Sequence, residues 1–257
     1  MTKQSFFTAL SKEDKQKPIV FCFPHAGGNS EDYLEWQRYL TSCAKLLAVC
    51  LPGTGRRFAE KHPDDIESLS NEIANEINSL GLSSYYLFGH SMGSILAYEV
   101  ALRVKNLPKA LIVSSSASPD FVPSLKVIKM NEMSDKNFAE ELSFFNGIEK
   151  QITETDDFFN FFLRKIRKHF ELIGRYKHKH TERLTIPIFS IVGDQDPHVS
   201  NDNIVKWSSM TSAEYTHHTV PGNHFYFNEN PELVSSIIKE CVCTTDHKEN
   251  YNQCLII

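Results

Sequence analysis

Residues 85–102 read YYLFGHSMGSILAYEVAL, and this stretch decides the fold of the chain. A short apolar run comes first, the G-x-S-x-G pentapeptide at 89–93 follows, and a helical pattern begins directly after it. This order predicts a tight turn between a strand and a helix, with the Ser91 hydroxyl pushed out of the sheet and glycines that let the backbone pass closely. The pentapeptide alone is a weak pattern, but in this setting it predicts that Ser91 is a nucleophile.

Strand and helix patterns alternate on both sides of this turn. Runs of strand length lie at residues 18–23, 46–51, 85–88, 110–114, 186–192 and 214–220. Helical spacing of apolar residues occurs at residues 33–40, 66–80, 94–102, 202–210 and 231–240. Such alternation predicts a mostly parallel sheet with helices on both faces, so we expect one α/β domain over residues 1–257.

Two segments depart from the alternation. Residues 118–185 form a long insertion between two strands. Its helix-like stretches are rich in phenylalanine, namely Phe138, Phe144, Phe145, Phe158, Phe159, Phe161, Phe162 and Phe170. We interpret the insertion as a helical lid; a plain helical subdomain with a phenylalanine core is an alternative that is compatible with a lid. Residues 244–257 begin with a polar stretch that predicts a disordered tail.

The composition excludes several classes of protein. The apolar share of 41% and the charged share of 23% are ordinary for a globular protein, and no apolar run reaches the roughly 18 residues of a membrane span. A net charge of −5 argues against nucleic-acid binding. Residues 1–17 lack the apolar segment and cleavage site of a signal peptide, so we expect a cytoplasmic protein. The six cysteines lack metal-ligand spacing, which predicts free thiols and no metal.

A nucleophilic serine requires a base and an acid elsewhere in the chain. The serine hydroxyl becomes reactive when an imidazole, oriented by a carboxylate, removes its proton. After this type of turn the acid is expected in the loop after a late strand, and the histidine in the loop after the last strand. His224 occupies the second position. Asp194 and Asp196 compete for the first position. The spacing from Gly193 favours Asp196, and Asp194 is then expected to bond the backbone of its own loop.

The oxyanion formed during acyl transfer requires two backbone N–H donors. One donor typically follows the nucleophile and the other lies in the loop after an early strand. We therefore expect the N–H groups of Met92 and Ala26 to form the oxyanion hole. The neighbouring His25 is interpreted as a residue that packs the loop, with a catalytic role as the less favoured alternative.

Five motifs in this order resemble those of the type II thioesterases, which edit nonribosomal peptide and polyketide synthases and belong to the α/β-hydrolase superfamily. The motifs are FPHAGG at 23–28, LPGTGRR at 51–57, GHSMG at 89–93, GDQD at 193–196 and GNHF at 222–225. Thr54 stands where the family often has arginine, and Asn223 where it often has a second glycine. Neither departure removes a catalytic group.

The resemblance implies hydrolysis of acyl thioesters from the phosphopantetheine arm of a carrier protein. Ser91 would carry the acyl group, His224 would act as base and then acid, and Asp196 would orient the imidazole. It implies no cofactor except the phosphopantetheine that the substrate carries, no metal, and a transient carrier partner for a monomer. Carrier proteins are usually acidic, so residues 164–183, with a net charge of +6, are a candidate docking surface; a solvated helix face is the alternative.

Three other functions remain compatible with these residues. A carboxylesterase or lipase would use the same triad on oxygen esters, and a medium-chain fatty acyl thioesterase has nearly the same motifs. A hydrolase-fold binding protein with an inactive site belongs to another class, although the intact Ser91, Asp196 and His224 argue against it.

Overall fold

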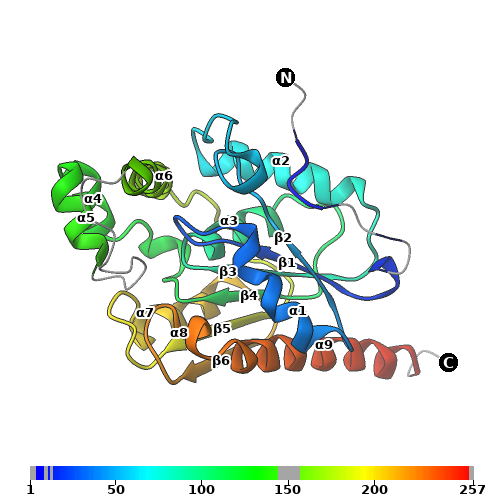
Figure 1. The fold of residues 1–257 in the computed structure, drawn as a ribbon. Helices are drawn as coiled ribbons and strands as arrows, with labels where there is room; N and C mark the ends of the chain where they lie inside the picture. Colours follow the sequence, from blue (N-terminus) through cyan, green and yellow to red (C-terminus); the bar gives the residue numbers. More distant parts are fainter. Residues whose placement is uncertain (1–3, 9–10, 12–13, 144–156, 255–257) are drawn as a thin grey trace.

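The sheet is parallel throughout. The structure is a computed structural model that describes residues 4–8, 11, 14–143 and 157–254. Within these residues, six parallel strands pair in the order β2-β1-β3-β4-β5-β6 (Figure 1). Their bounds are β1 Ile19–Phe23, β2 Lys45–Ala48, β3 Tyr85–His90, β4 Leu111–Ser114, β5 Ile188–Gly193 and β6 Tyr215–Val220. The predicted α/β class and parallel sheet are therefore confirmed.

Helices cover both faces of this sheet (Figure 1). One face is covered by α2 (Ile66–Ser79) and α3 (Met92–Ala101), and the opposite face by α1 (Gln37–Leu40), α8 (Tyr226–Glu229) and α9 (Pro231–Cys254). Shorter elements are α7 at Asn201–Ile204 and 3₁₀ turns at Asp14–Gln16, Ser30–Trp36, Gly55–Arg57, Pro119–Phe121 and Val205–Met210. The helix predicted at 202–210 is thus divided between α7 and a 3₁₀ turn.

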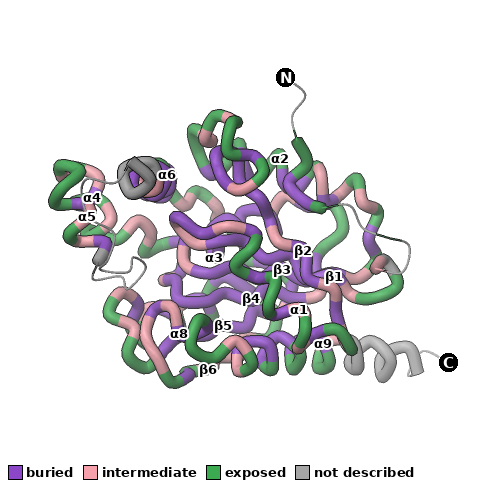
Figure 2. Tube along the Cα trace, viewed as in Figure 1, coloured by how far each residue is buried: buried purple, intermediate pink, exposed green. Residues whose placement is uncertain are grey.

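Alternate residues of each inner strand enter two different cores. On β1, Ile19 and Phe21 pack with α2 and α3, whereas Val20 and Cys22 pack with the helices of the opposite face. This follows from the two-residue period of a strand. Figure 2 shows the inner strands as almost continuously buried, which explains why their sequences are apolar runs without alternation.

The insertion between β4 and β5 is helical where it is described. It contains α4 (Leu125–Glu132), α5 (Asp135–Ser143) and α6 (Asp157–Gly174). Phe138 and Phe170 lie in a small core of its own, with ring centroids 5.2 Å apart. The predicted aromatic residues Phe144 and Phe145, and the side chains of Phe158, Phe159 and Phe161, lie outside the described part of the chain.

The C-terminal segment differs from the expected disordered tail. Helix α9 continues past Thr244 to Cys254, while residues 255–257 lie outside the described residues. Cys241 and Val242 are buried in the core under the sheet, and the Thr245 hydroxyl lies 2.7 Å from the hydroxyl of Tyr86. The polar residues therefore continue a helix whose preceding residues are buried against the sheet. Their polarity alone does not show this. No described helix is both long and apolar enough to cross a membrane.

Candidate active site

The pentapeptide forms a sharp turn between β3 and α3. Ser91 separates the two elements and has φ 54° and ψ −120°, a backbone conformation that few residues other than glycine adopt. A Cβ atom on Gly93 would lie 2.1 Å from the carbonyl oxygen of Phe23, so β1 can pass the turn only because residue 93 is glycine. The Ser94 hydroxyl donates to the Gly89 carbonyl at 2.7 Å and closes the turn.

The pairing of β5 with β6 brings the acid and the histidine together. Gly193 is in register with Val220, so the loops that follow these two strands leave the sheet side by side. His224 Nδ1 lies 2.9 Å from Asp196 Oδ2, and the two side chains are 5% and 0% exposed. In the neutral imidazole, Nδ1–H then donates to the carboxylate and leaves Nε2 as the acceptor that a serine proton requires.

The second Asp196 oxygen is also satisfied. Its Oδ1 accepts the backbone N–H groups of His198 at 2.8 Å and Val199 at 3.1 Å. Burial alone would raise the pKa of Asp196, but the hydrogen bond and charge of His224, together with the His198 N–H, lower this pKa below its ordinary value. Asp196 therefore stays ionised beside the imidazole.

Asp194 has a different role in the loop. It is exposed, and its Oδ1 accepts the backbone N–H of Gly222 at 2.9 Å. Asp194 thus links the loop after β5 to the loop after β6 through a hydrogen bond, whereas Asp196 of the same loop pairs with His224. The bond reaches the adjacent loop rather than the loop of Asp194 itself, a detail that depends on the pairing of β5 with β6.

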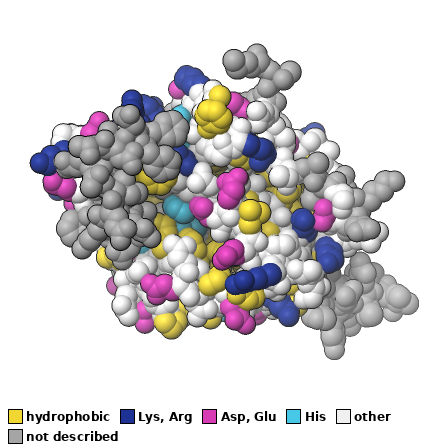
Figure 3. Space-filling model, in the orientation of Figure 1, with side chains coloured by type: hydrophobic (Ala, Val, Ile, Leu, Met, Phe, Trp, Pro, Cys, Tyr) yellow, Lys and Arg dark blue, Asp and Glu magenta, His cyan; other side chains and the backbone are white. Residues whose placement is uncertain are grey.

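One cavity of about 320 Å³ brings the predicted residues together. Ser91, His224, Ala26 and Met92 all line it. The rest of its wall is largely apolar and includes Ile95, Val122, Pro123, Val127, Phe170, Ile173 and Val199. On the face seen in Figure 3, histidine side chains lie at a hollow bordered by hydrophobic side chains. The cavity can thus hold an apolar group next to the Ser91 side chain.

The expected oxyanion donors are available. Among the described residues, neither the Ala26 N–H nor the Met92 N–H has a hydrogen-bond acceptor, although the following N–H groups in the first loop are all bonded. Gly27 donates to His169, Gly28 to the His25 carbonyl, and Asn29 to the Asp32 carboxylate. Phe23, the last residue of β1, is in register with Gly89 of β3. This pairing brings the loop after β1 close to the turn at Ser91.

Three further histidines lie near the site: His25, which was expected to pack the loop, and His198 and His169, which were not predicted from the sequence. His25 packs against Phe225, with ring centroids 4.9 Å apart, in agreement with its interpretation as a loop-packing residue. His198 lines the cavity, 5.2 Å from the His224 ring, and burial and the charge of His224 lower its pKa to about 4. His198 follows Asp196 by two positions, which is a signal that could have suggested it. His169 on α6 had no such signal.

The basic stretch at 164–183 is less exposed than its sequence suggests. Lys165 is buried and its ammonium donates to Asn29 Oδ1 at 2.6 Å. Arg167 pairs with Asp135 at 2.9 Å and stacks on the Phe138 ring. The expectation of one basic surface is therefore wrong for these two residues, because an amphipathic helix turns some of its cations toward its neighbours.

Comparisons with known proteins agree with this geometry. The profile of the family described as "Thioesterase domain" matches residues 18–241. The gramicidin S biosynthesis protein GrsT of Aneurinibacillus migulanus is 25% identical over 238 residues, covering 91% of this chain and 93% of GrsT. The thioesterase TesA of Mycobacterium marinum is 31% identical over 240 residues, covering 88% of this chain and 93% of TesA.

A solved structure leads to the same family. The type II thioesterase BorB from the borrelidin biosynthetic cluster is 30% identical, and its superposition covers 88% of this chain and 93% of BorB with a TM-score of 0.79. The match to the family profile spans both the Ser91 turn and the loops of Asp196 and His224. This chain belongs to the thioesterase domain family.

Proposed function

We propose that the protein hydrolyses acyl thioesters from the phosphopantetheine arm of carrier proteins, and so releases stalled or misprimed acyl groups during nonribosomal peptide or polyketide synthesis. The observation that carries the proposal is that His224, which pairs with the buried Asp196 side chain, lines the same cavity as Ser91, Ala26 and Met92. The N–H groups of Ala26 and Met92 have no acceptor among the described residues. The names of GrsT and BorB support a biosynthetic role of this kind.

Acylation of Ser91 is the first half of the reaction. His224 Nε2 removes the proton from the Ser91 hydroxyl, and the oxygen attacks the thioester carbonyl carbon. The carbonyl oxygen takes the negative charge and accepts the N–H groups of Ala26 and Met92. When the carbon–sulfur bond breaks, the imidazolium returns its proton to the departing thiolate, which leaves Ser91 as an acyl ester.

Water completes the reaction in the second half. His224 removes a proton from water, and the hydroxide oxygen attacks the acyl ester through the same oxyanion site. The imidazolium then protonates Ser91 as the acid product departs. Asp196 keeps Nδ1 protonated and stabilises the positive imidazole in both halves, and we propose that no cofactor takes part apart from the phosphopantetheine of the substrate.

The size of the cavity favours short and medium acyl groups. About 320 Å³ lies at the lower end of the roughly 300–1,000 Å³ typical of ligand pockets. Phe170 and Ile173 of α6 form part of its wall, so the insertion contributes to the acyl site. We infer that α6 acts as part of a lid over the acyl chain.

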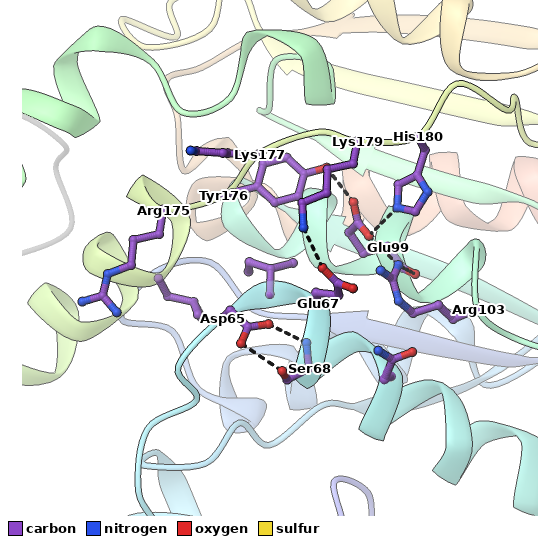
Figure 4. A pocket seen from close by; sticks show the side chains of 13 residues that line it. Asp65, Glu67, Ser68, Glu99, Arg103, Arg175, Tyr176, Lys177, Lys179 and His180 are labelled. Carbon is purple, nitrogen blue, oxygen red and sulfur yellow. Dashed lines mark hydrogen bonds and ion pairs between the residues drawn. The ribbon is translucent and has the colours of Figure 1, made fainter.

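The carrier protein would dock on the cations that remain exposed beyond α6. Arg175, Lys177 and Lys179 border a groove of about 440 Å³ between α2 and the segment that follows α6 (Figure 4). In this view the Lys179 ammonium donates to Glu67 of α2, and Glu99, which also lines the groove, accepts a hydrogen bond from the Tyr176 hydroxyl. Leu172 of α6 lines this groove, and Phe170 and Ile173 of the same helix line the acyl cavity, so a carrier docked here would lie beside the site.

Charge reversal tests the docking surface. Arg175→Glu/Lys177→Glu should raise KM for an acyl carrier by about 3- to 10-fold at low salt and leave acyl-CoA hydrolysis unchanged, because exposed charges act mainly on encounter. Lys105→Glu/Lys239→Glu is the matched control, since both lysines are exposed and neither lines the groove. An equal effect of both double variants, or an equal loss on acyl-CoA, would contradict docking at this surface.

A substrate comparison tests the proposed function itself. Acyl carriers, acyl-CoA and p-nitrophenyl esters of equal chain length are compared by kcat/KM, with Ser91→Ala as the inactive control. We expect carriers to be the best substrates. A preference for oxygen esters would identify a carboxylesterase, and a preference for medium-chain fatty acyl carriers or acyl-CoA would identify a fatty acyl thioesterase. A folded protein whose Ser91 fluorophosphonates do not label would be a binding protein.

We also propose that the protein works as a cytoplasmic monomer. Cys22, Cys43, Cys50, Cys241 and Cys243 are free thiols, which supports a reducing compartment. Light scattering coupled to size exclusion tests the monomer: a mass near 29.4 kDa is expected, and twice that mass at micromolar concentration would contradict it.

A further inference from the structure

Helix α6 makes a direct hydrogen bond to the loop that carries the Ala26 oxyanion donor. The backbone N–H of Gly27 donates to Nδ1 of His169 at 2.9 Å, across 142 positions of sequence. The His169 side chain is 0% exposed, so water does not compete for the bond. Sequence proximity plays no part in this contact.

The bond fixes the form of the imidazole. An N–H donor needs an acceptor, so Nδ1 of His169 must carry the lone pair and Nε2 must carry the proton. Burial, and then the charges of His62, Lys165 and His25, lower the pKa of His169 to about 3. The ring therefore remains a neutral acceptor throughout the pH range in which the enzyme would work.

The same bond orients one peptide unit of the loop, the unit between Ala26 and Gly27, and so constrains the backbone that directly follows the Ala26 N–H. Because a peptide unit is planar, the direction of the Gly27 N–H fixes the plane that it shares with the Ala26 carbonyl. Gly28 donates to the His25 carbonyl of the same loop, and Asn29 donates to the Asp32 carboxylate in the 3₁₀ turn that follows. Among the described residues, no acceptor is found for the N–H groups of His25 and Ala26, and Ala26 lies at the wall of the cavity.

Two further contacts come from the same side of α6. Lys165 donates to the Asn29 side chain at 2.6 Å. A Cβ atom on Gly27 would lie 2.7 Å from Cγ1 of Ile166, so the helix lies directly against the loop backbone, which has φ +88° there. Residues 165, 166 and 169 share one face of a helix, and α6 therefore holds the loop at three points.

We propose that His169 is a positioning residue that holds the oxyanion loop in its active shape, so that the oxyanion hole is complete only when α6 lies against the loop. The proposal rests on the proposed function, because it assigns the Ala26 N–H to the oxyanion. It differs from a substrate contact, since His169 touches the loop and not the reacting atoms.

Two substitutions separate the acceptor from the volume of the ring. His169→Leu keeps an apolar side chain and removes the acceptor, whereas the Oδ1 of His169→Asn can take the position of Nδ1. We expect the leucine variant to lose about 10- to 100-fold in kcat with little change in KM, because loss of orientation affects the transition state more than binding. The asparagine variant should recover most of this loss.

The assays use butyryl-CoA and p-nitrophenyl butyrate with the full chain. Equal losses in both variants, full activity of the leucine variant, or a change confined to KM would overturn the proposal. The two substrates also keep this test separate from that of the proposed function. If the wild-type protein hydrolyses only the oxygen ester, the thioesterase proposal fails while the comparison of the variants still stands.

A measurement on the wild-type protein covers the case in which a variant does not fold. Nitrogen-15 NMR of the labelled imidazoles should give His169 a protonated Nε2 and an unprotonated Nδ1 from pH 5.5 to pH 8. A protonated Nδ1 within this range would overturn the proposal, because the Gly27 N–H could not then donate to it.

Discussion

Acidification should destabilise this protein through its buried histidines, and His169 offers the sharpest test. The imidazole is fully buried and its pKa falls to about 3, first because of burial and then because of neighbouring His62, Lys165 and His25. In the unfolded chain the same group has a pKa of about 6.5. As the pH falls below 6.5, the His169 imidazole becomes protonated in the unfolded state but stays neutral in the folded state, so the free energy of unfolding decreases.

The magnitude follows from the separation of the two pKa values. Each pH unit between them changes the free energy of unfolding by about 1.4 kcal/mol. At pH 5.0, which is about one and a half units below the unfolded value, His169 should therefore remove about 2 kcal/mol of the stability present at pH 7.5. This is a large share of the roughly 5–15 kcal/mol that stabilises a typical domain.

Urea unfolding at pH 7.5, 6.0 and 5.0, followed by circular dichroism at constant ionic strength, measures the effect. His169→Asn cannot titrate, so it should lose about 2 kcal/mol less than the wild type between pH 7.5 and pH 5.0. Any packing loss appears equally at both pH values and cancels in the comparison. If the wild type and the variant lost the same amount of stability, the assignment of a depressed pKa to His169 would be refuted.

Three further predictions concern the site. Asp196→Asn should lower kcat by about 10⁴-fold while thioester binding is retained, because the amide no longer holds Nδ1 of His224 as a donor. Gly27→Ala should lose activity and about 1–2 kcal/mol of stability, since it places a Cβ at φ +88° and 2.7 Å from Ile166 Cγ1. Ile173→Phe should shift acyl-CoA preference toward shorter chains, because Ile173 lines the cavity. Steady-state kinetics and thermal unfolding measure these effects.

Each of these predictions has an outcome that contradicts it. An Asp194→Asn variant as impaired as Asp196→Asn would mean that the two carboxylates share the role. Gly27→Ala should regain part of its activity when Ile166 is also replaced by alanine, and no recovery would place the fault elsewhere than in the contact with α6. An unchanged chain-length profile in Ile173→Phe would mean that the acyl chain does not contact the cavity wall formed by Ile173.

Much of the fold and of the candidate site could be predicted from local sequence patterns. The apolar runs at 18–23 and 85–88 predicted buried strands because an inner parallel strand is apolar on both faces. The nucleophile turn at Ser91 could be predicted because an apolar strand pattern, the two glycines of the pentapeptide and a helical pattern lie within a few residues of one another. The order of Asp196 and His224 followed from the position of their loops after the last strands.

Other features depend on packing between distant segments. The sequence suggested one basic surface at 164–183, but Lys165 and Arg167 face neighbouring elements, because the position of α6 decides which of its cations reach solvent. Likewise, the polar residues from Thr244 onward suggested disorder, whereas α9 is anchored by buried residues before them.

The sequence by itself determined the α/β class, the nucleophile turn and the candidates for acid, base and oxyanion donors, because each depends on residues that are neighbours along the chain or on the order of loops. Only the tertiary structure decided that Asp196 pairs with His224 and that His169 holds Gly27. Those contacts depend on the register of β5 with β6 and on the docking of α6, and side-chain periodicity contains no information about how far apart two such segments finally lie.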